Sequence, residues 1–233
     1  MKNRISFFTI LMLLFFLSSQ VWAKEEVRDV SPFSKISLQI SANVYVLQDS
    51  KQSVRIVADQ ETLEKIITEV KDRTLSIRFP INKVFKRWNP GKIDIYIAVP
   101  EIDALSVTGS GDILSDKINS RILDLLVSGS GNIKIEKLAA EKVTANVSGS
   151  GDIILKDGGV ATEFSARISG SGNVDAKGFE AENINVQTSG SGSCHVFSNG
   201  GIKARISGSG NVYYSGNPAI DSSVSGSGSV KER

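Results

Sequence analysis

Two residues with reactive side chains, Cys194 and His195, are adjacent in the sequence and are the only cysteine and the only histidine of the chain. A thiol beside an imidazole can form a nucleophile with its base, or supply two ligands to a metal ion. The surrounding sequence favours another role for the thiol. Cys194 occupies a position of a sequence repeat that otherwise holds Ile or Val, so we expect it to be a small buried hydrophobe.

His195 falls at the next position of that repeat and is expected to face outward. The equivalent positions of the preceding and following units hold Asp175 and Tyr213. A row of Asp, His and Tyr could bind a ligand or shift the pKa of the imidazole. Paired surface side chains are the simpler interpretation, and we favour it. Asp175, His195 and Tyr213 are therefore candidates for contact with a ligand or partner, and we predict no catalytic residue here.

A second candidate is the segment from Lys83 to Lys92, which carries four positive charges and two aromatic residues without an acid. Such a segment could stack on sugars, lie at a lipid headgroup layer or hold an anionic glycan. The alternative, which we favour, is a solvated connection between two strands with one aromatic ring folded onto the core. Lys86, Arg87 and Trp88 are the residues of this segment that we select as possible contacts.

Seven Gly-Ser-Gly motifs recur at steps of 18 to 21 residues, a period that predicts stacked coils. A phosphate-binding loop needs a helix after its glycines, and a nucleophile elbow needs Gly-x-Ser-x-Gly; neither pattern occurs here. Calcium-binding β-rolls use a shorter, acidic repeat. We predict no cofactor and no metal. The expected role is a structural corner, for the glycines Gly109, Gly111, Gly129, Gly131, Gly149, Gly151, Gly170, Gly172, Gly190, Gly192, Gly208, Gly210, Gly226 and Gly228.

Apolar and polar residues alternate on both sides of these glycines, which predicts two strands in each coil with one face in water. Leu126 is the main exception. Before the motif, one outward position reads Ser106, Asn146, Arg167, Gln187, Arg205 and Ser223. After the motif, the inward position reads Ile113, Ile133, Ile153, Val174, Cys194, Val212 and Val230.

The residue that follows each second glycine supports stacking in sequence order. Stacked strands place equivalent residues about 4.8 Å apart, where two carboxylates would repel each other. No two aspartates are neighbours in the series Asp112, Asn132, Asp152, Asn173, Ser193, Asn211 and Ser229. We expect these side chains to form hydrogen bonds from coil to coil.

The segment from residue 34 to residue 100 has short alternating runs of a different kind, without the glycine motif. They predict strands near 36–38, 44–46, 54–57, 75–79 and 93–97. Only residues 59–66 are typical of a helix, with Asp59 as its N-cap.

The first 23 residues have a short basic start, an apolar run and a small-residue ending at Ala23, which is typical of a secretory signal peptide. A retained anchor is the alternative, but the run is short for a span of about 20 residues. No later segment is predicted to cross a membrane, and one cysteine cannot form an internal disulfide. Without Lys2 and Arg4, 25 basic residues balance 25 acidic ones. This balance argues against nucleic acid as a partner.

The mature chain resembles the secreted head GIN domain family, described as auto-transporter adhesins. The resemblance depends on Ala58-Asp59, on the strand that ends at Pro100, and on the repeated Ser-Gly-Ser-Gly motif, above all Gly131-Asn132-Ile133. It implies a β-helical protein of the cell surface or periplasm. It brings no catalytic residues.

Together these observations predict an all-β parallel β-helix, or β-solenoid, of coils of about 20 residues. The predicted parts are a signal peptide (1–23), an N-terminal β-rich portion (24–101) continuous with or packed on the solenoid, and the repeat solenoid (102–233). We predict a non-catalytic, exported interaction module of the periplasm, cell surface or medium. A surface glycan or an envelope protein is its expected partner, and the oligomeric state is left open.

Two alternatives remain. One is a glycan-binding protein or carbohydrate-active enzyme, since β-helices host such enzymes; however, the outward positions contain no repeated acidic pair. The other is a scaffold that assembles end to end. The charged end Lys231-Glu232-Arg233 argues against open polymerisation.

Overall fold

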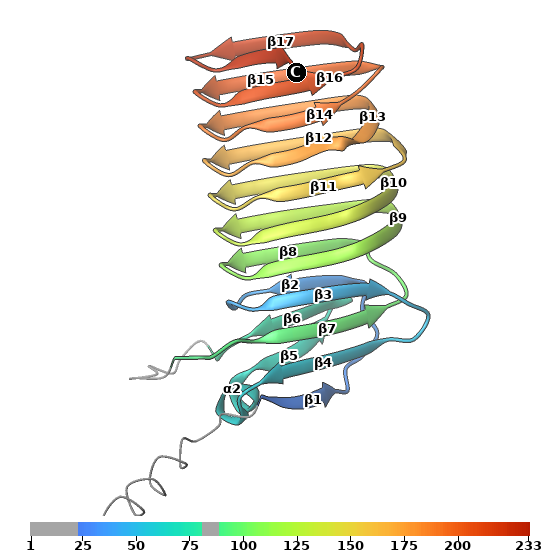
Figure 1. Ribbon diagram of the computed structural model, residues 1–233, viewed down its shortest axis with the longest axis vertical. Coiled ribbons are helices and arrows are strands. Elements are labelled where there is room, and N and C mark those ends of the chain that lie inside the picture. The colour runs from blue at the N-terminus through green and yellow to red at the C-terminus, as the bar shows by residue number, and fades with distance from the viewer. Residues whose placement is uncertain (1–22, 81–88) are drawn as a thin grey trace, which may run out of the picture.

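The computed structural model describes residues 23–80 and 89–233. The predicted signal peptide before Ala23, and the candidates Lys86, Arg87 and Trp88, lie outside these residues. The predicted all-β parallel solenoid is confirmed, and its coils are stacked in one column (Figure 1).

Each complete coil of the repeat has two long runs of strand that meet at a Gly-Ser-Gly corner. Neighbouring coils pair in parallel, with Gly149 beside Gly129 and Gly170 beside Gly149. The strands are β8 (Ala104–Gly109), β9 (Asp112–Gly129), β10 (Asn132–Gly149), β11 (Ile153–Gly158), β12 (Val160–Gly170), β13 (Val174–Gly190), β14 (Cys194–Phe197), β15 (Gly201–Gly208), β16 (Asn211–Ser215), β17 (Ala219–Ser225) and β18 (Ser229–Glu232).

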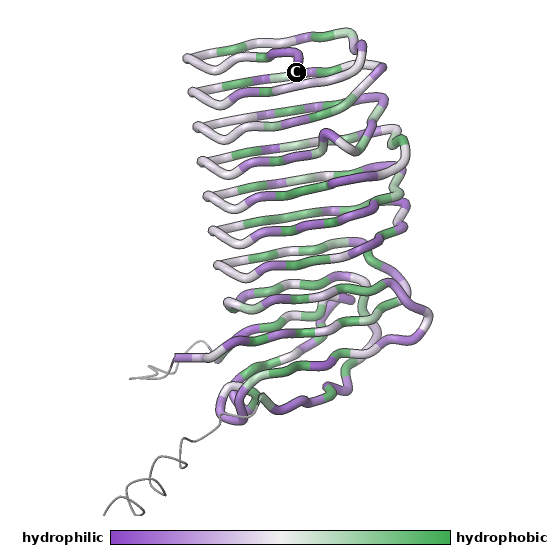
Figure 2. The backbone as a smooth tube through the Cα atoms, viewed as in Figure 1, coloured by the Kyte–Doolittle hydropathy of each residue, from purple (hydrophilic) through white to green (hydrophobic). Residues whose placement is uncertain are grey.

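The two runs form two sheets, which we name by their position relative to the corner. The pre-corner face contains β8, the second halves of β9, β10 and β13, and β12, β15 and β17. The post-corner face contains the first halves of β9, β10 and β13, and β11, β14, β16 and β18. Figure 2 shows hydrophilic and hydrophobic residues alternating along these strands.

The two glycines of a corner are required for different reasons. Gly129 has a φ of 127°, which an L-residue with a side chain rarely adopts. Gly131 has an ordinary φ, but a Cβ atom there would lie 2.0 Å from the carbonyl oxygen of Gly111 in the coil before. The predicted structural corner is therefore present, with one glycine setting the turn and the other allowing the coils to approach.

The predicted row of Asp, Asn and Ser side chains is present beside the corner. Asn132 donates from its Nδ2 to Asp112 Oδ1 at 2.8 Å, and its own Oδ1 accepts from the backbone N–H of Asp152 at 3.0 Å. In the same way, Asn173 donates from its Nδ2 to Asp152 Oδ1, and its Oδ1 accepts from the backbone N–H of Ser193. Each coil thus satisfies polar groups of the next.

The interior between the faces is a continuous apolar core. Cys194 is fully buried in it, as the sequence predicts, and burial raises the pKa of its thiol far above the usual range. Leu126 faces outward and is 41% exposed. Thr188 is one of five buried polar residues, and its hydroxyl, in a side chain 3% exposed, has no hydrogen-bond partner among the described residues.

The N-terminal portion continues the stack, although its strands are not added in sequence order. β2 (Lys35–Leu38) pairs in parallel with β8, and β3 (Asn43–Gln48) pairs in parallel with β9. On the far side of that coil lie β6 (Thr74–Arg78), beside β2, and β7 (Asp94–Val99), beside β3. Residues 49–103 are therefore an insertion between β3 and β8, and their strands extend the stack on the side of β2 and β3 that faces away from the repeat.

Antiparallel strands close this lower end. β4 (Ser53–Ala58) pairs with β7 and with β1 (Lys24–Arg28), and β5 (Ile67–Lys71) pairs with β6. The sequence did not predict β1 or β5. The predicted helix is α2 (Gln60–Lys65), with Asp59 accepting from the backbone N–H of Thr62 at 2.9 Å. Leu63 of α2 is buried at 1% exposure and covers the core, whereas β17 at the other end is exposed along its whole length.

Candidate functional site

The candidate residues Asp175, His195 and Tyr213 are neighbours on the post-corner face. Asp175 of β13, His195 of β14 and Tyr213 of β16 lie in register on adjacent strands. The rings of His195 and Tyr213 are 4.8 Å apart between centroids. Arg233 adds a contact that the sequence did not predict: its Nη1 lies 3.2 Å from His195 Nδ1. The structure brings the three residues together, and their role in binding stays a prediction.

The imidazole of His195 is held toward its neutral form. Partial burial lowers its pKa, and the nearby cations Arg233 and Lys177 act in the same direction. The Asp175 carboxylate opposes them. Cys194 cannot act with this imidazole because it points into the core, whereas His195 points out.

The row of His195 continues over the whole post-corner face, because β3, β7, β4 and β1 extend the same sheet. We call it the post-corner row. In spatial order it comprises Val27, Arg55, Tyr96, Tyr45, Leu114, Lys134, Ile154, Asp175, His195, Tyr213 and Lys231.

Two tyrosines form the centre of the lower part of this row. Tyr45 and Tyr96 are stacked, with 5.1 Å between ring centroids and 17° between planes. The Arg55 guanidinium lies 4.2 Å from the centroid of Tyr96, and it is also paired with Glu25 at 2.9 Å. Tyr96 therefore has the Tyr45 ring on one side and the Arg55 guanidinium on the other. Its ring edges are partly exposed.

A hollow of about 470 Å³ lies beside the two rings. The small residues of its lining are Ser53, Ala98 and Ser115. Val27 and Leu47, which also line it, are 68% and 58% exposed. Nine large hydrophobic residues are exposed in residues 23–80 and 89–233, and Val27, Leu47, Tyr45 and Tyr96 are four of them. We call Val27, Tyr45, Leu47 and Tyr96 the tyrosine platform.

The sequence alone did not identify the tyrosine platform. Tyr45 and Tyr96 fall on strands that were predicted correctly, at alternating positions that face outward. Nothing in the repeat indicates that strands 51 residues apart pair with each other. The only available signal was an aromatic residue at an outward strand position in each of two segments.

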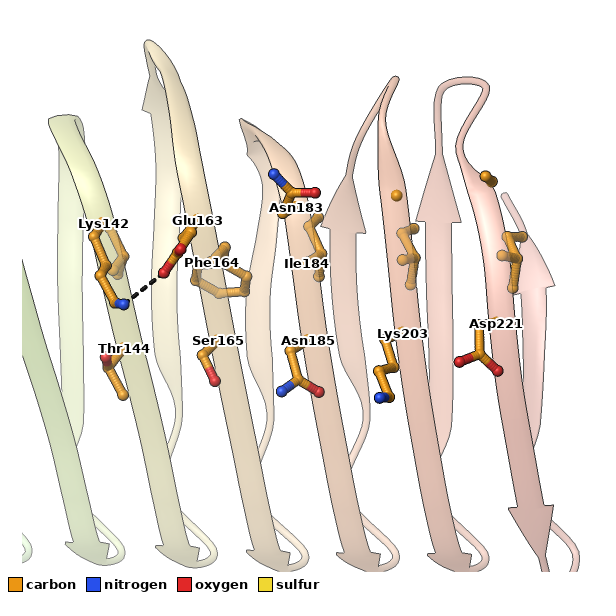
Figure 3. A pocket seen from close by; sticks show the side chains of 15 residues that line it. Lys142, Thr144, Glu163, Phe164, Ser165, Asn183, Ile184, Asn185, Lys203 and Asp221 are labelled. Atoms are coloured by element: carbon orange, nitrogen blue, oxygen red, sulfur yellow. Dashed lines mark ion pairs between the residues drawn. The ribbon is translucent and has the colours of Figure 1, made fainter.

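The pre-corner face carries a larger hollow of about 770 Å³ across β10, β12, β13, β15 and β17. Figure 3 shows its polar side chains in rows, with Lys142 paired to Glu163 at 2.5 Å and Asn185, Lys203 and Asp221 below. Gly201 and Ala219 continue the row of Lys142 on the later strands, and their small side chains leave space there.

A smaller hollow of about 200 Å³ lies at the corner edge, next to Gly91 and Lys92 at the end of the basic aromatic segment. Lys92 forms an ion pair with Asp94 at 2.8 Å, and Asn43 donates to the same carboxylate at 3.1 Å. Burial opposes the ionisation of Asp94, but the hydrogen bonds from Lys92 and Asn43 outweigh it and lower its pKa.

Residues 23–80 and 89–233 contain neither a metal-binding cluster nor a membrane-spanning helix. No group of three or more His, Cys, Asp or Glu side chains in that part of the chain is arranged to hold a metal ion. In the same part, no helix combines the length and the apolar character that a membrane span requires.

Comparison with known proteins gives a consistent match over most of the chain. A family model described as "Putative auto-transporter adhesin, head GIN domain" matches residues 32–218. Among solved structures, a "putative adhesin" from Bacteroides fragilis NCTC 9343 has a TM-score of 0.85 and 27% identity, covering 91% of this chain and 97% of its own. No curated protein matches the chain.

Two further similar structures come from Parabacteroides distasonis ATCC 8503. One is described as a "putative lipid binding protein", with a TM-score of 0.76, 25% identity, and coverage of 92% of this chain and 98% of its own. The other is a "putative adhesin", with a TM-score of 0.71, 26% identity and the same coverage. The shared architecture thus occurs in proteins described by what they bind.

Proposed function

We propose that this chain, which belongs to the head GIN domain family of auto-transporter adhesins, is a non-catalytic binding module of the cell envelope. Its predicted signal peptide supports export, and the names of its structural relatives support a binding role. The solenoid would act as a rigid support that presents its faces to a partner.

The tyrosine platform is the observation that carries this proposal. Soluble proteins rarely expose large apolar residues as a contiguous group, and such groups mark interaction sites. Tyrosine and arginine are also the residues that contribute most at protein interfaces. In the platform, two ordered tyrosines border a hollow that an apolar side chain of a partner can fill.

The geometry of the rings favours a protein partner over a sugar at this place. A sugar ring binds flat against the open face of an aromatic ring. Tyr96 has Arg55 on one face and Tyr45 on the other, so its faces are covered. The Arg55 charge is balanced by Glu25, and Asp116 is the other charged residue of the lining, in which apolar side chains are in the majority.

Retention on envelopes of the organism that makes the protein tests this function. The exported protein is compared with the double variant Tyr45→Ser/Tyr96→Ser. We expect retention to fall about tenfold, because the loss of two interface aromatics costs more than about 1.4 kcal/mol. The part of the retention that the platform variant loses should be abolished by protease treatment of the envelopes and left unchanged by periodate oxidation of their glycans.

The matched control is Ile122→Ser/Val160→Ser, which removes two exposed apolar residues elsewhere on the solenoid. This control should bind as the unchanged protein does. Equal retention of the platform variant, or platform-dependent retention that survives protease, would refute the proposal. Retention on protein-free phospholipid vesicles that is lost with the platform would instead assign an acyl chain to the hollow.

A further inference from the structure

Three long polar side chains stand in line on the pre-corner face, away from the tyrosine platform. Arg167 of β12, Gln187 of β13 and Arg205 of β15 are in register on adjacent strands. They line a hollow of about 370 Å³. We call them the Arg-Gln-Arg row.

The two arginines of this row differ in how they are held. Arg205 is fixed by Asp221, whose carboxylate accepts from Nη1 at 3.2 Å and from Nη2 at 3.0 Å. The Arg167 side chain forms no hydrogen bond or ion pair with any described residue. Lys203 lies in the same area without an ion pair to a described residue, so three cations are near a single acid. In a chain that is neutral once its signal peptide is removed, this is a local excess of positive charge.

Hydroxyl groups border the arginines on the side toward the corner. Ser169, Ser189 and Ser207 are in register with each other, two residues beyond the Arg-Gln-Arg row, and all three line the hollow. The lining contains no aromatic residue. The hollow therefore offers charged and neutral hydrogen-bond donors together, along a line parallel to the solenoid axis.

The spacing of these donors matches an extended acidic sugar chain. Adjacent strands are about 4.8 Å apart, so Arg167 and Arg205 stand about 10 Å apart with Gln187 midway. In an extended polysaccharide, the length of one sugar unit along the chain is similar to this spacing between adjacent strands. We propose that the pre-corner face binds an acidic polysaccharide along the solenoid axis, with carboxylate or sulfate groups at the two arginines and ring hydroxyls at Gln187 and the serines.

Arginine suits this role because its planar guanidinium binds a carboxylate or sulfate through two parallel hydrogen bonds, and Arg167 has this donor pair available. Arg205 already donates to Asp221 from both Nη atoms, so it contributes its remaining N–H groups and its charge. A phospholipid headgroup would satisfy the arginines equally well. Its acyl chains, however, would then lie against Ser, Gln and Arg side chains, and burying those polar groups is unfavourable. A soluble acidic chain meets no such cost.

The test measures binding of the exported protein to immobilised polygalacturonate and dextran sulfate, with neutral dextran as the reference polymer. We expect binding to the two acidic polymers only, weakening as salt is raised. The variant Arg167→Gln/Arg205→Gln should bind at least about tenfold more weakly, since a lost hydrogen bond to a charged group costs about 1.5–3 kcal/mol. Arg167→Lys should lose part of the affinity, because it keeps the charge and loses the planar donor pair.

The control Arg121→Gln/Lys137→Gln removes the same charge at exposed positions elsewhere and should bind normally. Thermal unfolding of each variant checks that the fold is intact. Equal binding by the variant and its control, no binding of either acidic polymer, or preference for anionic vesicles or a DNA oligonucleotide would overturn the proposal. Tyr45→Ser/Tyr96→Ser should keep polysaccharide binding, so this proposal and the proposed function can fail separately.

Discussion

At the residue scale, the direction in which a side chain points decides its chemistry in this fold. Cys194 and His195 are adjacent in sequence, yet one is sealed in the core and the other belongs to an exposed row. A strand places successive side chains on opposite faces, so two neighbours cannot act on one substrate. The pair that looked most reactive in the sequence is divided by the strand.

Thr188 illustrates the cost of a polar group on the inward side. Its position holds Ile168 and Ile206 in the adjacent coils, and its hydroxyl has no partner. We expect Thr188→Val to stabilise the protein by about 1 kcal/mol, because a methyl group of the same shape replaces an unsatisfied buried hydroxyl.

Denaturant unfolding of Thr188→Val measures this difference. The control is Thr144→Val on the outward side, where no gain is expected. A loss of stability in Thr188→Val would mean that the hydroxyl makes a favourable contact after all.

His195 should make stability depend on pH. Burial lowers its pKa below the usual 6.5. In the unfolded chain the imidazole therefore binds a proton at a higher pH than in the folded chain. The contribution of neutral His195 is complete above about pH 6.5 and is lost as the pH falls below that value. Arg233 adds to the loss, because it faces a charged imidazole at 3.2 Å.

The measurement is the melting temperature between about pH 7.5 and pH 5, above the range in which most carboxylates titrate. We expect His195→Gln to show a smaller decrease than the unchanged protein. Parallel curves for the two proteins would show that this imidazole does not control the pH dependence.

At the element scale, the corner is the unit that sets the spacing of the coils. Gly131 meets a backbone oxygen of the preceding coil, which cannot move aside as a flexible side chain can. Gly109, in the first corner, has open space around its missing Cβ and is required only for its φ of 116°. The two positions should therefore respond differently to the same substitution.

We expect Gly109→Ala to cost about 1–3 kcal/mol, the usual cost of a strained backbone conformation. Gly131→Ala should cost more than about 4 kcal/mol or prevent folding, because two coils must separate. Gly159→Ala is the control, since that glycine has neither a positive φ nor a close neighbour. Unfolding curves of the three variants give the order. Equal losses at Gly109 and Gly131 would contradict the division of roles.

At the scale of the whole molecule, the two ends of the column are closed in different ways. At the lower end, α2 and antiparallel strands cover the core. At the other end, Ile220 and Val224 of β17 are each 41% exposed. Glu232 of β18 lies in register with Tyr214 of β16, which in turn lies in register with the buried Val196 of β14. Glu232 therefore occupies an inward strand position. An inward charge at an open sheet edge discourages pairing with another chain.

This arrangement predicts that Glu232→Val promotes association at the coil of β17 and β18. The variant replaces the charge of Glu232 by an apolar side chain, in an end coil where Ile220 and Val224 are already exposed. Light scattering over a range of concentrations measures the effect, with Lys231→Val as the control on the outward side. The unchanged protein should scatter as a species of constant size. Filaments formed by it would favour the scaffold hypothesis instead.

The two sites that we propose, one for a protein and one for an acidic polysaccharide, lie on different faces of the solenoid. The post-corner face carries the hollow beside the tyrosine platform. The pre-corner face carries the hollow that is lined by the Arg-Gln-Arg row and by a parallel row of serines. A rigid solenoid can present both without either site affecting the other, because each coil contacts only its neighbours.

The sequence by itself determined whatever depends on one coil and the next: the alternation, the corner glycines, the Asp and Asn row and the burial of Cys194. Each of these follows from a local period that repeats along the chain. It also placed Arg167, Gln187 and Arg205 at one outward position, although not beside a hollow. The tertiary structure alone decided that β2 and β3 pair with β8 and β9 on one side and with β6 and β7 of the insertion 49–103 on the other. Only the pairing of β3 with β7 brings Tyr45 against Tyr96, because no short-range pattern encodes the pairing of strands so far apart.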